Sequence, residues 1–178
     1  NTARNSTGSF GTSTDALAIA GYTTTNVANV ESWNGSSWSE TTDVNTARYG
    51  AMCAGTTSDG IAAGGKNPAF ANTEKWNGTS WTETGDLNTA RGYGSASKNG
   101  NSSNVLVASG DPFSATTELF NGTSWTELAD IATTRYTGAN GGTSAGMLIF
   151  GGYTPPGSPT AVSEEWTTDS ALSTITVS

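Results

Sequence analysis

The chain has 178 residues and a net charge of −8, from seven basic and fifteen acidic residues. Charged residues make up only 12% of it, against about 25% in ordinary soluble domains. No cluster of Lys and Arg is present, which argues against nucleic acid and an anionic membrane surface as partners, since both attract clustered cations.

The chain has no histidine and one cysteine, Cys53. The missing histidine excludes Ser-His-Asp and Cys-His catalysis, His-containing zinc sites and most copper sites. We therefore expect neither a metal nor a cofactor. Cys53 cannot form an intrachain disulfide, and its neighbours Met52 and Ala54 predict a small, buried, apolar side chain. No apolar run approaches the ~18 residues of a membrane span.

Two sequence motifs recur along the chain with the same period of about 44 residues. Asn-Thr-Ala-Arg begins at Asn1, Asn45 and Asn88, and a degenerate copy, Ala-Thr-Thr-Arg, begins at Ala132. An aromatic-Asn-Gly phrase follows in three units, at Trp33–Trp38, Trp76–Trp81 and Phe120–Trp125, and the fourth unit keeps Trp166. The chain therefore consists of four tandem repeats, at residues 1–44, 45–87, 88–131 and 132–178.

The second repeat shows the predicted elements in order. Residues 49–55 form a strand of small residues, and residues 56–60 form a polar turn. A short apolar strand at 61–63 ends at a Gly-Gly pair. Strands at 73–76 and 80–83 then flank Asn77-Gly78, the strongest short hairpin signal. In the last repeat, residues 172–177 read as the fourth strand.

Four short antiparallel strands in about 44 residues predict one blade of a β-propeller. One blade cannot cover both faces of its own sheet, but stacking around an axis covers them. We therefore expect an all-β, four-bladed β-propeller that occupies the whole chain as one domain. The blades would each be a four-stranded antiparallel sheet.

The repeats resemble Kelch repeats, as in the central domain of galactose oxidase. The residues that carry the resemblance are the strand end at Gly64-Gly65 or Gly151-Gly152, the aromatic pair Trp76 and Trp81, and the arginine after the fourth strand. The resemblance implies a propeller, but the copper site of galactose oxidase needs histidine ligands that this chain lacks. The phrases also resemble Kelch-like proteins of marine phages and ocean metagenomes, which implies an extracellular or virion-associated protein.

The chain departs from the Kelch pattern at two strand ends. Ala20-Gly21 and Ser109-Gly110 replace the double glycine in the first and third units. Kelch rings also usually have more than four blades. We expect a monomer, and the alternative is a dimer in which two chains share one larger ring.

Residues that recur in all four units are interpreted as structural. They comprise four arginines, four glutamates and four aromatic residues: Arg4, Arg48, Arg91, Arg135, Glu31, Glu74, Glu118, Glu164, Trp33, Trp76, Phe120 and Trp166. A repeated ion pair or a repeated Arg-Trp stack explains them. A catalytic site needs unlike groups with separated pKa values, whereas a symmetric ring supplies the same group repeatedly.

Residues that break the repeat are the better functional candidates. The loops between the second and third strands differ in length and chemistry, at 22–29, 66–72, 111–116 and 153–161, and each carries one aromatic residue. Variable loops on a rigid scaffold are a usual place for binding. The candidate ligand-binding residues are Tyr22, Asn29, Lys66, Phe70, Asp111, Phe113 and Tyr153. Alternatively, the aromatic side chains cover the core at the base of the loops.

These loops predict a non-catalytic binding module, with a glycan or a protein as its partner. The first hypothesis is recognition of a carbohydrate or receptor through the variable loops. The alternative is a purely structural or protein-interaction module of a virion or a secreted assembly, favoured by the uniform repeats. A glycan-active enzyme is the third hypothesis, but a glycosidase needs two carboxylates, and Asp111 is the only non-repeated acid in these loops.

Overall fold

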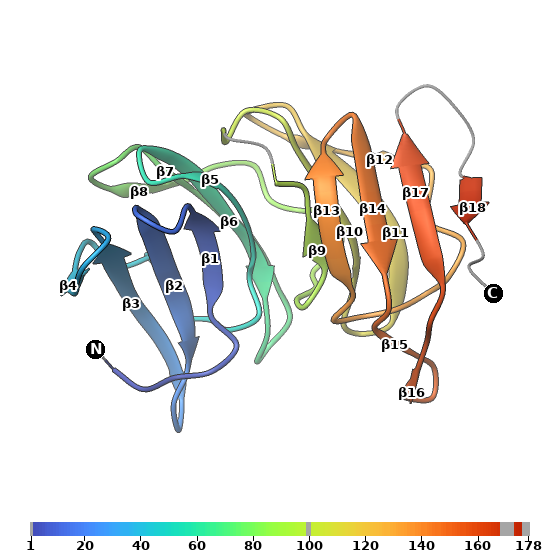
Figure 1. Ribbon diagram of the computed structural model, residues 1–178, viewed down its shortest axis with the longest axis horizontal. Helices are drawn as coiled ribbons and strands as arrows, with labels where there is room; N and C mark the ends of the chain where they lie inside the picture. Colours follow the sequence, from blue (N-terminus) through green and yellow to red (C-terminus); the bar gives the residue numbers. More distant parts are fainter. Residues whose placement is uncertain (1, 99–100, 168–172, 176–178) are drawn as a thin grey trace.

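The computed structural model describes residues 2–98, 101–167 and 173–175. Four antiparallel four-stranded sheets are arranged as a four-bladed β-propeller, as the repeat predicts (Figure 1). Each repeat forms one blade, and the first strands of successive blades lie in contact. Within the described part of the chain there is no helix, and hence no helix that could cross a membrane.

The strands follow the chain order within each blade. Blade 1 contains β1 (Gly8–Gly11), β2 (Ala16–Tyr22), β3 (Asn26–Trp33) and β4 (Trp38–Glu40). Blade 2 contains β5 (Met52–Thr56), β6 (Asp59–Gly65), β7 (Phe70–Trp76) and β8 (Trp81–Glu83). Blade 3 contains β9 (Ser95–Ala96), β10 (Val105–Gly110), β11 (Ser114–Phe120) and β12 (Trp125–Leu128). Blade 4 contains β13 (Ala139–Thr143), β14 (Gly146–Phe150), β17 (Ser163–Thr167) and β18 (Ser173–Ile175), with a small hairpin of β15 (Tyr153–Thr154) and β16 (Ser158–Pro159) before β17.

Several strands are longer than the sequence predicts. In blade 2, β5 and β6 pair from Met52–Ala63 to Thr56–Asp59, so the predicted five-residue turn shrinks to two residues. Strands β3, β7 and β11 begin inside the predicted loops, because the pairing with the second strand continues there. The last predicted strand is described only at Ser173–Ile175, and its other residues lie outside the described part.

A bulge ends the second strand of blades 1 to 3. The register of the second and third strands shifts at Ala20, Gly64 and Ser109. The backbone of these residues is in the left-handed region, with φ of 53°, 66° and 63°. Gly151 of blade 4 has a φ of 67°. A bulge of this kind bends the strand. A double glycine is therefore not required, since Ala and Ser hold the same conformation.

Hydrophobic clusters lie between successive blades. The first joins Phe10, Leu17 and Ile19 of blade 1 to Trp76 and Trp81 of blade 2. Equivalent clusters join blade 2 to blade 3 and blade 3 to blade 4. The core is thus divided among the interfaces between blades, as expected for a repeat protein in which each unit packs on its neighbours.

Each blade contains one Arg–Glu ion pair beside these clusters. The pairs in blades 2, 3 and 4 have completely buried side chains, whereas the pair in blade 1 has side chains that are 3% and 8% exposed. The pairs are Arg4–Glu31, Arg48–Glu74, Arg91–Glu118 and Arg135–Glu164. Glu74 also accepts hydrogen bonds from the backbone N–H groups of Asn45 (2.7 Å) and Thr46 (3.2 Å). The pair therefore fixes the segment that enters the blade.

Candidate functional site

Four predicted site residues occupy one repeat position at the end of the second strand. Each pairs through an isolated β-bridge with a residue that precedes the first strand of its blade. The bridges are Asn5–Tyr22, Tyr49–Lys66, Gly92–Asp111 and Tyr136–Tyr153. Each bridge joins the segment that enters a blade to the end of its second strand, and we call these bridged residues with their immediate neighbours the axial mouth.

A cluster of tyrosines forms the part of the axial mouth contributed by blades 1 to 3. The ring centroids of Tyr22 and Tyr49 lie 5.2 Å apart, and those of Tyr49 and Tyr93 lie 5.8 Å apart, both edge-to-face. The hydroxyl groups of Tyr93 and Ser6 are hydrogen-bonded at 2.9 Å. These rings support one another, since edge-to-face contacts at such distances are favourable.

A second aromatic cluster forms the part contributed by blades 3 and 4. Phe113 meets Tyr136 edge-to-face with centroids 5.0 Å apart. Tyr136 in turn stacks on Tyr153 at 5.7 Å. Tyr153 is 44% exposed, the highest exposure among the large hydrophobic side chains of the described residues. This cluster therefore presents aromatic surface to solvent.

An ion pair lies between the two aromatic clusters. The Nζ atom of Lys66 is 2.8 Å from Oδ2 of Asp111, and the two side chains are 21% and 33% exposed. The side-chain amide of Asn26 donates to the carbonyl of Asn67 at 3.0 Å and so holds the loop after Lys66. The axial mouth thus combines aromatic rings with one cation, one anion and several hydroxyl groups.

The axial mouth leads to a small cavity of about 220 Å³. Its lining comes from all four blades: Ser6, Thr7, Gly50, Ala51, Tyr93, Gly94, Thr137 and Gly138. Most of these lining residues have small side chains, which leave the space between the first strands open. Ligand pockets for drug-sized molecules are about 300–1,000 Å³. The cavity therefore suits one small ring or one side chain.

Three predicted site residues take no part in the four bridges of the axial mouth. Asn29 belongs to β3 rather than to a loop. Phe70 is the first residue of β7, and the guanidinium carbon of Arg48 lies 5.8 Å from its ring centroid. Phe113 is partly buried and joins the aromatic cluster of the mouth through its ring contact with Tyr136. Of the seven predicted residues, the structure brings Tyr22, Lys66, Asp111 and Tyr153 to the mouth itself.

Sequence reasoning missed three tyrosines of the axial mouth. Tyr49 and Tyr136 directly follow a repeated arginine, and Tyr93 follows Arg91 by two residues. The buried Arg–Glu pairs hold these segments against the sheets, so the backbone that carries the tyrosines is fixed. The signal was a tyrosine just after the repeated arginine in three units out of four.

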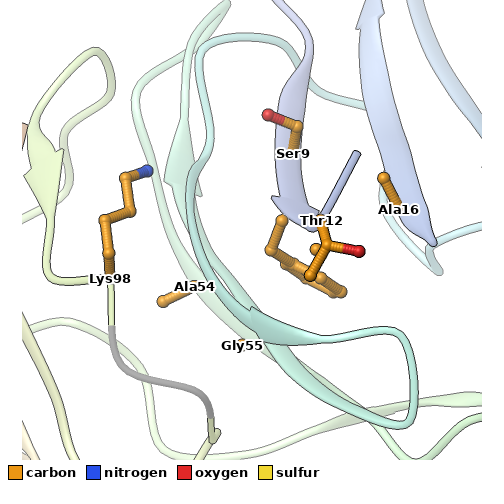
Figure 2. A pocket seen from close by; sticks show the side chains of 8 residues that line it. Ser9, Thr12, Ala16, Ala54, Gly55 and Lys98 are labelled. Atoms are coloured by element: carbon orange, nitrogen blue, oxygen red, sulfur yellow. The ribbon is translucent and has the colours of Figure 1, made fainter. Parts of the chain in front are cut away.

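A second cavity, of about 360 Å³, lies farther along the first strands (Figure 2). Ser9, Thr12 and Ala16 of blade 1 line one side, and Lys98, after β9, lies opposite them. Ala54 and Gly55 of blade 2 complete the wall. This cavity offers hydroxyl groups and one ammonium group, and its one aromatic lining residue, Phe10, is only 8% exposed, unlike Tyr153 of the axial mouth.

Burial raises the pKa of the Cys53 thiol from 9.0 to about 12. Burial disfavours the charged thiolate, and this effect outweighs the attraction from Lys98 and Arg48. A buried thiol with a raised pKa is a poor nucleophile and a poor metal ligand. Among the described residues, no three His, Cys, Asp or Glu side chains group together to hold a metal ion.

The chemistry of the axial mouth is thus that of a polar surface with stacked aromatic rings. Such a surface can hold a ligand by stacking on its apolar faces and by hydrogen bonds to its polar groups.

Comparisons with known proteins assign no function to this site. No protein-family model matches the chain, and no curated protein sequence matches it significantly.

Proposed function

We propose that the protein is a non-catalytic binding module that recognises carbohydrate through the axial mouth. The observation that supports this proposal is the 44% exposed Tyr153, stacked on Tyr136 in the same axial mouth that contains the Lys66–Asp111 ion pair. A sugar ring has an apolar C–H face that packs on an aromatic ring, and hydroxyl groups that hydrogen-bond to charged and polar side chains. The small axial cavity suits one monosaccharide unit.

The test is a glycan array that includes bacterial polysaccharides, followed by calorimetric titration of each glycan that binds. We expect Tyr153→Ala and Tyr22→Ala to weaken binding at least tenfold, because each removes a stacking surface. The matched controls are Tyr153→Phe and Tyr22→Phe, which keep the ring and should retain most of the affinity. Absence of binding to every glycan on the array, or unchanged affinity in both alanine variants, would contradict the proposal.

The geometry of Asp111 supports binding rather than glycoside hydrolysis. Its carboxylate is paired with Lys66 at 2.8 Å, whereas a glycosidase positions two carboxyl groups on either side of the scissile bond. Measurable turnover of any glycoside by the wild type, lost in Asp111→Asn, would replace the proposed binding function by catalysis.

A second candidate function is a structural or protein-interaction module of a virion or a secreted assembly. It is supported by the exposed apolar residues Leu148 and Phe150 on β14 and Trp38 on β4, which lie away from the axial mouth. Exposed apolar patches mark interaction surfaces in soluble proteins. Absence of glycan binding, together with stable binding of a different protein that Leu148→Asp or Trp38→Asp abolishes, would favour this function.

We also infer that the repeats are Kelch-like. The inference is supported by the Gly-Gly or equivalent bulge after the second strand and by the buried arginine that enters each blade. An extracellular or virion-borne location agrees with the low content of charged residues, 12%. Secretion or particle association of the native protein, followed with an antibody, would test that location.

A further inference from the structure

The two faces of each blade have different neighbours. We call the sheet face that turns to the next blade the forward face, and the opposite one the backward face. The hydrophobic clusters cover the forward faces of blades 1 to 3 and the backward faces of blades 2 to 4. Among the described residues, no hydrophobic cluster covers the forward face of blade 4 or the backward face of blade 1.

The forward face of blade 4 is apolar and exposed. At one position of the second strand, Leu17, Ile61 and Leu106 are at most 2% exposed, but the equivalent Leu148 is 39% exposed. At the position two residues later, Ile19, Ala63 and Ala108 are completely buried, but the equivalent Phe150 is 42% exposed. Blade 4 therefore carries the residues of an interface without the blade that covers them.

The backward face of blade 1 also lacks a covering blade. Trp81 and Trp125, each the second aromatic residue of its repeat, are 6% exposed because the preceding blade covers them. The equivalent Trp38 is 38% exposed. Beside it a cavity of about 200 Å³ is lined by Arg4, Ala18 and Trp38, among others.

Backbone hydrogen bonds between blades end at the same two faces. Along the axis, Gly50 N–H donates to Ser6 O (2.8 Å), Tyr93 N–H to Gly50 O (2.8 Å), and Thr137 N–H to Tyr93 O (2.9 Å). At the bulge, the second-strand glycines Gly21, Gly65 and Gly110 donate to the carbonyls of Arg48, Arg91 and Arg135 in the following blade, at 2.8–2.9 Å. Continuing both series requires Ser6 N–H to meet the carbonyl of Thr137, and Gly152 N–H to meet the carbonyl of Arg4.

We propose that these two faces bind a second copy of this chain, so that two chains form one ring of eight blades. The faces complement each other because they are the two halves of an interface that the chain already builds three times. Figure 1 shows blade 1 at one end of the molecule and blade 4 at the other. A second copy supplies both missing neighbours, the backward face of a blade 1 for blade 4 and the forward face of a blade 4 for blade 1.

The proposed ring has two-fold symmetry about the propeller axis. The contact of blade 4 with blade 1 then occurs twice, and the ring closes with no face left over. Eight blades also lie within the usual propeller range of about 4–8. The ring selects the dimeric alternative left open by the sequence, and it does not depend on carbohydrate binding.

An engineered disulfide tests the proposed interface. Between blades 1 and 2, a Cβ placed on Gly8 would lie 3.4 Å from the Cβ of Cys53, close to the ~3.5–4.5 Å of disulfides. The equivalent residues on the open faces are Ala139 and Ser9, which are both exposed. We expect Ser9→Cys/Ala139→Cys, in a Cys53→Ala background, to give a covalent dimer on a non-reducing gel after oxidation.

The controls for this experiment are Ser9→Cys and Ala139→Cys alone, each of which should leave only a background of dimer. A cross-link within one chain would overturn the proposal, because it would mean that four blades close on themselves. Absence of any specific cross-link in the double variant would also overturn it.

The mass in solution gives an independent test. By analytical ultracentrifugation at micromolar concentration we expect twice the 18.1 kDa of one chain. Leu148→Asp and Trp38→Asp should each raise the Kd of the dimer at least 100-fold. Thr126→Asp, on an exposed position of β12, is the matched control and should remain dimeric. Circular dichroism and thermal melting verify that each variant is folded.

A mixture of Leu148→Asp and Trp38→Asp retains one unaltered pair of faces. We expect this mixture to form a 1:1 heterodimer at concentrations at which each variant alone is monomeric. A wild-type monomer, an open-ended polymer, or a dimer that both variants leave unchanged would overturn the eight-bladed ring.

Discussion

Arg48 and Glu74 form an ion pair in which both side chains are completely buried. Arg48 also donates to the carbonyl groups of Gly64 (3.1 Å) and Asn72 (2.7 Å), so one guanidinium joins the bulge, the third strand and the carboxylate. A planar group with five N–H donors suits this role, and lysine would not replace it. The pair connects the entry segment of blade 2 to its sheet and positions Tyr49 at the axial mouth.

Removing the carboxylate of Glu74 should strongly destabilise the protein. Glu74→Ala leaves the guanidinium of Arg48 without its charge partner and two backbone N–H groups without an acceptor. Breaking a buried pair from one side costs about 3–5 kcal/mol. Urea unfolding measures the loss, and Glu83→Ala on the exposed part of β8 is the control, expected within about 0.5 kcal/mol of the wild type. A loss as small as that of the control would show that the pair contributes little.

The buried thiol of Cys53 predicts a loss of stability at high pH. Because its pKa rises from 9.0 to about 12, the folded protein keeps the thiol proton at pH values where the unfolded chain releases it. This contribution is complete below pH 9 and is lost as the pH rises from 9 to 12, by on the order of 1 kcal/mol per pH unit. Cys53→Ala should therefore lose less stability over this range than the wild type, as measured by urea unfolding at several pH values. Parallel pH curves for the two proteins would contradict the prediction.

Gly78 occupies a turn that only glycine adopts without strain. Its φ is 95°, and Asn77 Oδ1 accepts hydrogen bonds from the N–H groups of Thr79 (2.9 Å) and Ser80 (2.8 Å). A Cβ on Gly78 would be 3.5 Å from Ser58 Cα, an ordinary contact, so the expected cost of Gly78→Ala is conformational, about 1–2 kcal/mol. Gly146→Ala is the control, because Gly146 has no positive φ and a Cβ there would meet only Trp166 O at 4.0 Å. Thermal melting should show a lower Tm for the first variant only.

The Lys66–Asp111 ion pair should contribute little to stability. Its side chains are 21% and 33% exposed, and ion pairs in contact with water are typically worth about 0–1 kcal/mol and are screened by salt. We expect Lys66→Met and Asp111→Asn to change the free energy of unfolding by less than about 1 kcal/mol. The difference from the wild type should shrink as the salt concentration of the urea titration rises. A larger, salt-independent loss would show that the pair has a structural role.

Much of the fold could be predicted because the signals are local and repeated four times. The Asn-Gly phrases predicted the hairpins between third and fourth strands, and the period of about 44 residues predicted one blade per repeat. The strand ends were predicted less well. Asn29 and Phe70 were placed in loops, but pairing with the second strand extends β3 and β7 over them.

The candidate site was only partly predictable. Tyr22, Lys66, Asp111 and Tyr153 were named because they lie in the loops that vary between repeats, and the structure brings them to one mouth. Tyr49, Tyr93 and Tyr136 were missed because they lie about 20 residues away along the chain, before the first strand of a blade. Only the bridge between that segment and the end of the second strand brings the two groups together.

The sequence by itself determined the number of blades, the strand order and the chemistry of each repeat position, because these depend on neighbouring residues along the chain. Only the tertiary structure decided which faces are covered. Leu106 and Leu148 occupy the same repeat position, yet one is buried and the other is 39% exposed. Burial depends on how one blade packs on the next, a relation between sheets that no single repeat encodes. That relation leaves the forward face of blade 4 and the backward face of blade 1 open to a partner.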